Sequence, residues 1–148
     1  MEVALVVSMM TSDEEVIAAA YLHDVLEDTS TTAEEVEKQF GARVLSLVAA
    51  ESEDKSKTWQ ERKTSTIEHL KTASYEVKLL ALADKVCNLR STARDYLAIG
   101  DRVWERFREK EKSRHQWYFQ GLLDSLKELE DQPAYQELEQ LYKFVFGT

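Results

Sequence analysis

The chain has little of what usually interrupts helices, since only four glycines and one proline occur among its 148 residues. This scarcity favours long helices over many short strands. No apolar run approaches the ~20 residues that a membrane-spanning helix needs. The single cysteine, Cys87, excludes a disulfide within the chain and is typical of a reducing compartment. We therefore expect a cytoplasmic protein in which Cys87 fills part of the core.

Positive charge is also scarce, because 19 lysines and arginines face 28 aspartates and glutamates, for a net charge of −9. This balance argues against general binding to nucleic acid, which needs a basic footprint. A small anionic ligand held by a few local cations and a metal remains compatible with it. Hydrophobic residues make up 43% of the chain, a fraction typical of globular proteins. The length predicts one domain over residues 1–148.

Helical signals follow one another along the chain and predict an all-α bundle of about seven to eight helices. Ser12 and Glu15 form a possible capping box for a helix that reaches about Leu26. Thr32 and Glu35 repeat this signal for a short helix that ends near Phe40, before Gly41. Further helices are predicted over about 2–10, around 44–48, and over about 59–71, 75–99, 113–130 and 134–146.

Two segments place charge within apolar helical sequence. The segment AYLHDVLEDT carries His23 and Asp24, and KLLALADKVCNLR carries Asp84. A histidine and carboxylates in such surroundings are costly to bury unless a cation compensates them. The pattern therefore predicts a metal site between helices, with His23, Asp24 and Asp84 as ligands. Mixed imidazole and carboxylate ligation suits Mn²⁺, Fe²⁺ or Zn²⁺ better than Ca²⁺.

A second acidic pair, Glu27 and Asp28, follows His23 and Asp24 at a spacing of four residues, which puts all four near one helix face. These carboxylates could orient or deprotonate a metal-bound water. The alternative is that they only charge the end of a helix. Acidic groups there oppose the helix dipole, which disfavours chance placement. Asn88 follows Asp84 at the same spacing and is predicted to face the same cavity.

AAAYLHDVLEDT together with LADKVCNLRS resembles the HD-domain metal-dependent phosphohydrolases. More narrowly, the chain is similar to the small alarmone hydrolases of the RelA/SpoT-homologue family, and EDKSKTWQERK and QWYF also resemble segments of that family. The resemblance implies a Mn²⁺-dependent enzyme that removes pyrophosphate from the 3′ position of guanosine tetra- or pentaphosphate, giving GDP or GTP.

The resemblance also implies roles for single residues. It gives His23, Asp24 and Asp84 as metal ligands, Glu27 and Asp28 as the acidic pair needed for hydrolysis, and Lys55, Asn88 and Tyr118 as lining of the nucleotide and phosphate pocket. The first metal histidine of the family is expected upstream of Met1. Two alternatives stay open: hydrolysis of another nucleotide or phosphoester, and a catalytically impaired chain that binds a nucleotide or a partner. Without the family, Lys55 would be interpreted as a solvated lysine.

Other side chains are expected to pack rather than to bind. His69 and His115 are interpreted as surface or packing residues. Packing anchors are also expected from Trp59, Trp104, Trp117 and Phe119. In the first helix, by contrast, we expect Val3, Val6 and Val7 to expose apolar surface, which makes a homo-oligomer a reasonable expectation.

Overall fold

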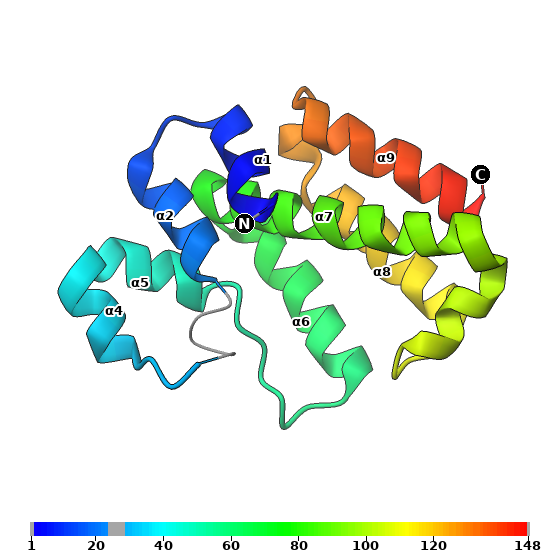
Figure 1. The fold of residues 1–148 in the computed structure, drawn as a ribbon, viewed down its shortest axis with the longest axis horizontal. Coiled ribbons are helices and arrows are strands. Elements are labelled where there is room, and N and C mark those ends of the chain that lie inside the picture. Colours follow the sequence, from blue (N-terminus) through cyan, green and yellow to red (C-terminus); the bar gives the residue numbers. More distant parts are fainter. Residues whose placement is uncertain (1, 24–28, 148) are drawn as a thin grey trace. The chain divides into compact units, whose positions relative to one another are not determined.

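The computed structural model describes residues 2–23 and 29–147 (Figure 1). Throughout these two stretches the regular structure is helical, with eight α-helices, two short 3₁₀-helices and no strand. The all-α prediction is therefore confirmed. Among the helices described, none combines the length and the apolar character that crossing a membrane requires.

Contacts along the chain divide it into two compact units. The first comprises Met1–Glu53 and Ser74–Asp84, and the second comprises Asp54–Ala73 and Lys85–Thr148. The long helix α7 (Tyr75–Ile99) contributes to both units. The assignment of one domain over residues 1–148 stays a prediction.

The first unit consists mainly of short helices (Figure 1), and their buried apolar side chains form a small core. Helix α2 contacts both α1 and α5, and α4 contacts α5. Before the first part of α7, the helices are α1 (Glu2–Met10), α2 (Glu14–Leu22), α4 (Ala33–Phe40) and α5 (Ala42–Ala49). Fully buried side chains from each of these elements meet in this core, among them Val7, Val16, Val36, Val44 and Leu82.

Helix α2 begins one residue later than the capping box predicts. Asp13, and not Ser12, is the N-cap, and its Oδ1 accepts a hydrogen bond from the backbone N–H of Glu15 at 3.0 Å. The guanidinium of Arg43 on α5 also binds the Asp13 carboxylate through two nitrogens, at 2.8 and 3.1 Å. This tertiary contact fixes the carboxylate at the helix start, so a pattern of neighbouring residues could not indicate it.

The start of α4 and the ends of α4 and α7 follow the sequence signals. Thr32 caps α4 by accepting from the backbone N–H of Glu35, and Gly41 ends the helix with a φ of +95°. Gly100 follows Ile99 with a φ of +63°, so α7 ends where glycine is predicted to end it. Both glycines adopt a conformation that other residues rarely accept.

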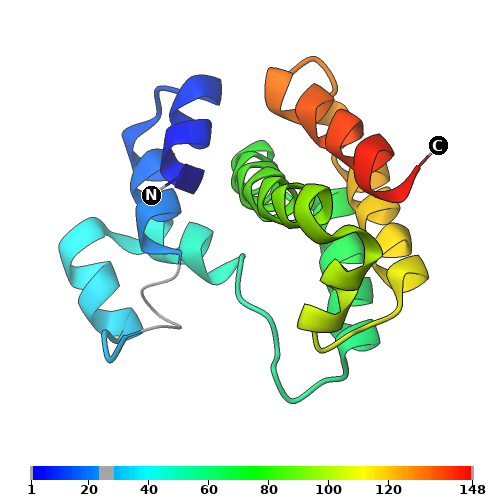
Figure 2. The same cartoon turned by 45° about the vertical axis from the view of Figure 1, so that its right-hand side comes forward.

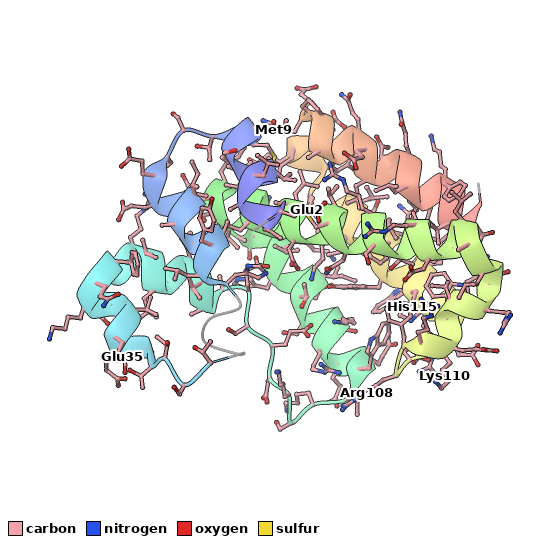
Figure 3. All side chains as sticks on the ribbon, in the orientation of Figure 1. Glu2, Met9, Glu35, Arg108, Lys110 and His115 are labelled. Carbon is pink, nitrogen blue, oxygen red and sulfur yellow. The ribbon has the colours of Figure 1, made fainter. Side chains whose placement is uncertain are left out.

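The expected exposure of the first helix is wrong. Val3, Val6 and Val7 are 8%, 5% and 0% exposed, because their face of α1 packs against α2. The exposed apolar residues of α1 are instead Leu5 and Met9, at 63% and 80%. Met9 is labelled in Figure 3. The burial removes the reason for which a homo-oligomer was expected, and the oligomeric state stays a prediction.

The second unit places α8 between two other helices. Helix α8 (Lys112–Ser125) contacts both α6 (Trp59–Thr72) and α9 (Pro133–Phe146), and α6 and α8 lie side by side in both views (Figures 1 and 2). Arg90 of α7 binds both carboxylate oxygens of Glu137 on α9, with a separation of 2.6 Å between Nη2 and Oε1. Figure 2 also shows the 3₁₀-helix η1 (Gly100–Arg106), which follows α7.

The helix predicted over residues 113–130 is shorter. Helix α8 ends at Ser125, and the 3₁₀-helix η2 (Lys127–Leu129) follows. Leu126 and Leu129 are 0% and 1% exposed, and a spacing of three residues matches one 3₁₀ turn. Burial of both leucines therefore favours a change in helix type at this point.

Gly121 allows α8 to approach α6 closely. A Cβ atom at this position would overlap Cδ1 of Ile67 and lie 3.1 Å from its Cγ1. Ile67 is only 7% exposed, so its side chain has little room to move. One turn further along α8, the hydroxyl of Ser125 donates to the carbonyl oxygen of Ile67 at 3.0 Å, which holds the two helices at this distance.

We predict that Gly121→Ala lowers the free energy of unfolding by about 1–3 kcal/mol, because overpacking outweighs the higher helix propensity of alanine. Urea denaturation of the purified protein measures this change. Ile67→Val removes the overlapping methyl group, so the double variant should lose less stability than the two single losses added together. Strict additivity of the two changes would contradict the overlap.

Candidate functional site

Two of the predicted metal ligands are neighbours in the first unit. His23 directly follows α2, and Asp84 lies on α7. The Nε2 atom of His23 is 3.5 Å from Oδ1 of Asp84, and the two side chains are 15% and 18% exposed. The structure therefore brings together, in a largely buried position, two residues that are 61 positions apart in the chain.

The orientation of His23 indicates what the pair could bind. Its Nδ1 atom lies 2.8 Å from the carbonyl oxygen of Ala20, which can only accept, so Nδ1 carries a proton. In the neutral ring, Nε2 then presents a lone pair toward the Asp84 carboxylate. Bonds of ~2.1 Å to one metal ion place adjacent ligand atoms roughly 3.0–3.4 Å apart. The separation of 3.5 Å therefore fits two ligands of one ion.

The remaining predicted residues of this centre are Asp24, Glu27 and Asp28, and they lie outside the described residues. Their roles as third ligand and acidic pair stay predictions. Over residues 2–23 and 29–147, no three His, Cys, Asp or Glu side chains gather so that they could hold a metal ion. The described part of the centre thus consists of the His23 and Asp84 pair.

The second unit contains a cavity of about 480 Å³, a volume within the usual range for small-molecule sites. Asn88 and Tyr118, both predicted to bind the substrate, are among its lining residues. Lys55, the third predicted binding residue, is exposed in a turn before α6 and does not line it. Four helices line the cavity, together with Phe107, the residue that follows η1. The lining residues are Trp59 and Lys63 of α6; Asn88, Ser91, Thr92 and Asp95 of α7; Val103, Trp104 and Arg106 of η1; and His115, Tyr118 and Phe119 of α8.

One wall of the cavity is polar and comes from α7. Asn88, Ser91, Thr92 and Asp95 lie at the spacing that places side chains on one helix face. From Asn88 to Asp95 the face extends about 10.5 Å along the helix axis. Amide, hydroxyl and carboxylate groups along this length can exchange hydrogen bonds with a sugar and a base.

The other walls are aromatic. The ring centroid of His115 lies 5.0 Å from those of Trp104 and Phe107 and 5.4 Å from that of Trp59, and Trp59 is 6.1 Å from Tyr118. The interpretation of Trp104 as a packing anchor agrees with its exposure of 4%, and the same ring also faces the cavity. These rings offer apolar faces against which a nucleotide base can lie.

Trp117 is the exception among the expected anchors. It leaves 39% of its surface exposed, and its ring is tilted against that of Trp59 at a centroid separation of 6.5 Å. The neighbouring Phe119 is buried, so the helix turns one of the two rings inward and the other outward.

The cavity differs between its two ends. The Nζ atom of Lys63, a lining residue, lies 5.1 Å from the ring centroid of Tyr118, and that of Lys85, which is not among the lining residues, lies 5.9 Å from the same ring. At the later end of α7, Nη1 of Arg106 donates to Oδ2 of Asp95 at 3.2 Å. One end of the cavity is therefore basic. The other end contains the ion pair of Asp95 and Arg106 together with the rings of Trp104 and Phe107.

Lys63 was missed as a site residue by sequence reasoning. It lies four residues after Trp59 in the segment EDKSKTWQERK, which the family resemblance already singles out. That spacing places both side chains on one face of α6, which is the signal that could have identified Lys63. His115, interpreted as a surface or packing residue, is 7% exposed and packs against three aromatic rings (Figure 3).

Burial favours the neutral form of His115. Its Nε2–H donates to the carbonyl oxygen of Glu109 at 2.7 Å. Desolvation lowers the pKa of His115 below its ordinary value near 6.5; the hydrogen bond to Glu109 and the charge of that residue raise it, and Lys63 adds to the lowering. The net direction is downward, so the uncharged ring is the form that the fold stabilises.

We predict that this histidine makes the fold less stable in acid. A lowered pKa means that the unfolded chain binds more protons, so stability falls as the pH drops below about 6.5 and stops falling below the folded pKa. The unfolding midpoint should therefore fall less in His115→Phe than in the wild type between about pH 7.5 and about pH 5.

Thermal unfolding followed by circular dichroism measures this difference. His69→Gln is the matched control, because His69 is an exposed histidine on α6. An equal fall of the midpoint in wild type and His115→Phe would show that His115 does not contribute.

Comparison with known proteins assigns the fold and the motifs to a class. The family model described as HD domain matches residues 1–111. The chain therefore belongs to the HD-domain family, and the resemblance noted in the sequence is confirmed.

Within this family, the chain is similar to guanosine-3′,5′-bis(diphosphate) 3′-pyrophosphohydrolases named MESH1. It is 48% identical to the Danio rerio protein over 83 residues, which are 56% of this chain and 46% of that protein. It is 38% identical to the Mus musculus protein over 135 residues, which are 91% of this chain and 69% of that protein. The matches to the Danio rerio, Drosophila melanogaster and Xenopus tropicalis proteins span about half the length of each.

Two solved structures share the fold. The crystal structure of lmo0812 from Listeria monocytogenes EGD-e superposes with a TM-score of 0.89 at 34% identity, over 99% of this chain and 97% of that one. A metazoan ortholog of SpoT that hydrolyses ppGpp superposes with a TM-score of 0.79 at 29% identity, over 99% of this chain and 79% of that one.

Proposed function

We propose that the chain is a metal-dependent hydrolase that removes pyrophosphate from the 3′ position of guanosine tetra- or pentaphosphate, giving GDP or GTP. The observation that carries this proposal is the orientation of His23, whose Nε2 faces the Asp84 carboxylate in a chain of the HD-domain family. The names of the MESH1 relatives support the choice of substrate. A cytoplasmic location is part of the proposal, and the buried thiol of Cys87 is compatible with it.

HD-domain hydrolases depend on a metal ion. We assign the ion as Mn²⁺, because imidazole and carboxylate ligands together suit it. His23 and Asp84 would hold it, with Asp24 as a third ligand. When bound, such an ion polarises a phosphoryl oxygen and lowers the pKa of water.

The protein's own groups then manage the protons of the reaction. Water attacks the phosphorus that is bonded to the 3′ oxygen, the bond between them breaks, and the 3′ oxygen takes a proton as pyrophosphate leaves. We assign to Glu27 the removal of a proton from the attacking water and to Asp28 the supply of a proton to the 3′ oxygen. For these two roles, one carboxyl group of the centre must be ionised to accept a proton and the other must be protonated to supply one.

The two different ends of the cavity support one orientation for the nucleotide. Phosphate groups would bind at the basic end, where Lys63 lies against Tyr118. The base would lie at the other end, against Phe107, which is half-buried and lines the cavity. Asn88, the first residue of the polar α7 face, is assigned to the sugar. Lys55, on its exposed turn, is assigned to a further phosphate group.

We predict that Asp84→Asn lowers both Mn²⁺ content and pyrophosphate release from guanosine tetraphosphate, the latter by about 10²-fold or more, since a lost ligand weakens metal binding. Elemental analysis and a pyrophosphate assay with added Mn²⁺ measure the two effects. Asp131→Asn, an exposed aspartate between η2 and α9, is the matched control. Undiminished metal content and turnover in Asp84→Asn would refute the assignment.

We also predict that Lys63→Met weakens binding of GDP by about tenfold or more and leaves guanosine nearly unaffected, because only GDP carries the phosphates that the ammonium group contacts. Isothermal titration calorimetry with both ligands separates the two effects. Lys71→Met changes an exposed lysine of the same helix and should alter neither affinity. An equal loss for guanosine and GDP would place Lys63 away from the phosphates.

A further inference from the structure

The end of the cavity opposite Lys63 carries a carboxylate in a defined orientation. Asp95 is the last polar residue of the α7 face, and its Oδ2 accepts from Nη1 of Arg106 at 3.2 Å. The side chains of Asp95 and Arg106 are 40% and 58% exposed, so they lie at the mouth of the cavity. Phe107, the residue after Arg106, is half-buried and lines the same end.

A purine at this end would meet Phe107 with its face and Asp95 with its edge. Guanine presents two neighbouring donors on its Watson–Crick edge, the N1–H and the 2-amino group, and a carboxylate presents two acceptors. The two parallel hydrogen bonds from guanine to a carboxylate are charge-assisted, and their fixed geometry makes them specific. Adenine presents the N1 acceptor and the 6-amino donor, so its N1 lone pair would face a carboxylate oxygen.

We propose that Asp95 selects guanine over adenine in this cavity and that Arg106 positions its carboxylate. The inference deepens the proposed function, on which its choice of a purine nucleotide rests. The ion pair with Arg106 restricts the rotamers of Asp95, which lowers the entropy lost when a base binds. Arg106 acts through Asp95 and is a positioning residue.

The test measures binding of GDP and ADP by isothermal titration calorimetry, without any turnover. Wild type should bind GDP about tenfold or more tightly than ADP, because adenine leaves an acceptor opposed to the carboxylate. Asp95→Asn should lose most of the preference for GDP, since a side-chain amide offers one donor and one acceptor and can match either base. Asp95→Ala should lose affinity for GDP without gaining affinity for ADP.

Glu105→Gln is the matched control, because Glu105 is an exposed acidic residue of η1 that does not line the cavity. It should keep the ratio of the two affinities. Arg106→Gln, if Arg106 acts by positioning, should reduce the preference for GDP less than Asp95→Ala does. Circular dichroism of each variant shows that the fold is retained.

The outcomes separate this inference from the proposed function. A wild-type protein that prefers GDP but releases no pyrophosphate from guanosine tetraphosphate would refute the hydrolase and support the selection of guanine by Asp95. An unchanged ratio in a folded Asp95→Asn variant overturns the inference. So does a wild type that binds both nucleotides equally or binds neither.

Discussion

Helix α7 must bury apolar residues around most of its circumference and still keep one line of polar side chains accessible. Leu82, Ala83 and Val86 are 0% exposed around Asp84, which shows how little room the helix leaves for a charge. Asp84 is the last α7 residue of the first unit, and Asp95 follows 11 positions later in the second unit. The order of the predicted metal ligand and of the cavity residue along the chain is therefore fixed by covalent structure.

Charge is distributed so that an acidic chain can hold an anion. With a net charge of −9, the protein repels nucleotides at long range unless cations are concentrated where they bind. Lys63, which lines the cavity, lies against the ring of Tyr118, and Lys85 lies near the same ring. A metal ion bound by His23 and Asp84 would add positive charge next to the Asp84 carboxylate. Under the proposed function, these local cations would offset the overall charge for a small ligand.

The features predicted from sequence are those that short-range chemistry determines. The bounds of α7 follow from its apolar pattern and from Gly100, whose positive φ ends it. Asn88 and Tyr118, which motifs predicted, both line the cavity, and their binding roles stay predictions. Features set by tertiary burial were missed. The change to a 3₁₀ turn after Ser125 depends on where Leu126 and Leu129 are buried, and the role of Lys63 depends on α6 packing against α8. Residues 24–28, which carry half of the motif, lie outside the described structure.

The same distinction separates residues that support the fold from residues that select a ligand. Gly121 and His115 act where the protein is closely packed, so changes there alter the free energy of unfolding first and binding second. The ion pair of Asp95 and Arg106 is largely exposed, and such pairs contribute little to folding because water screens them. A bound base would exclude that water, which raises the cost of an unmatched acceptor. Discrimination at Asp95 therefore arises only in the complex, where it can change without any change in the stability of the free protein.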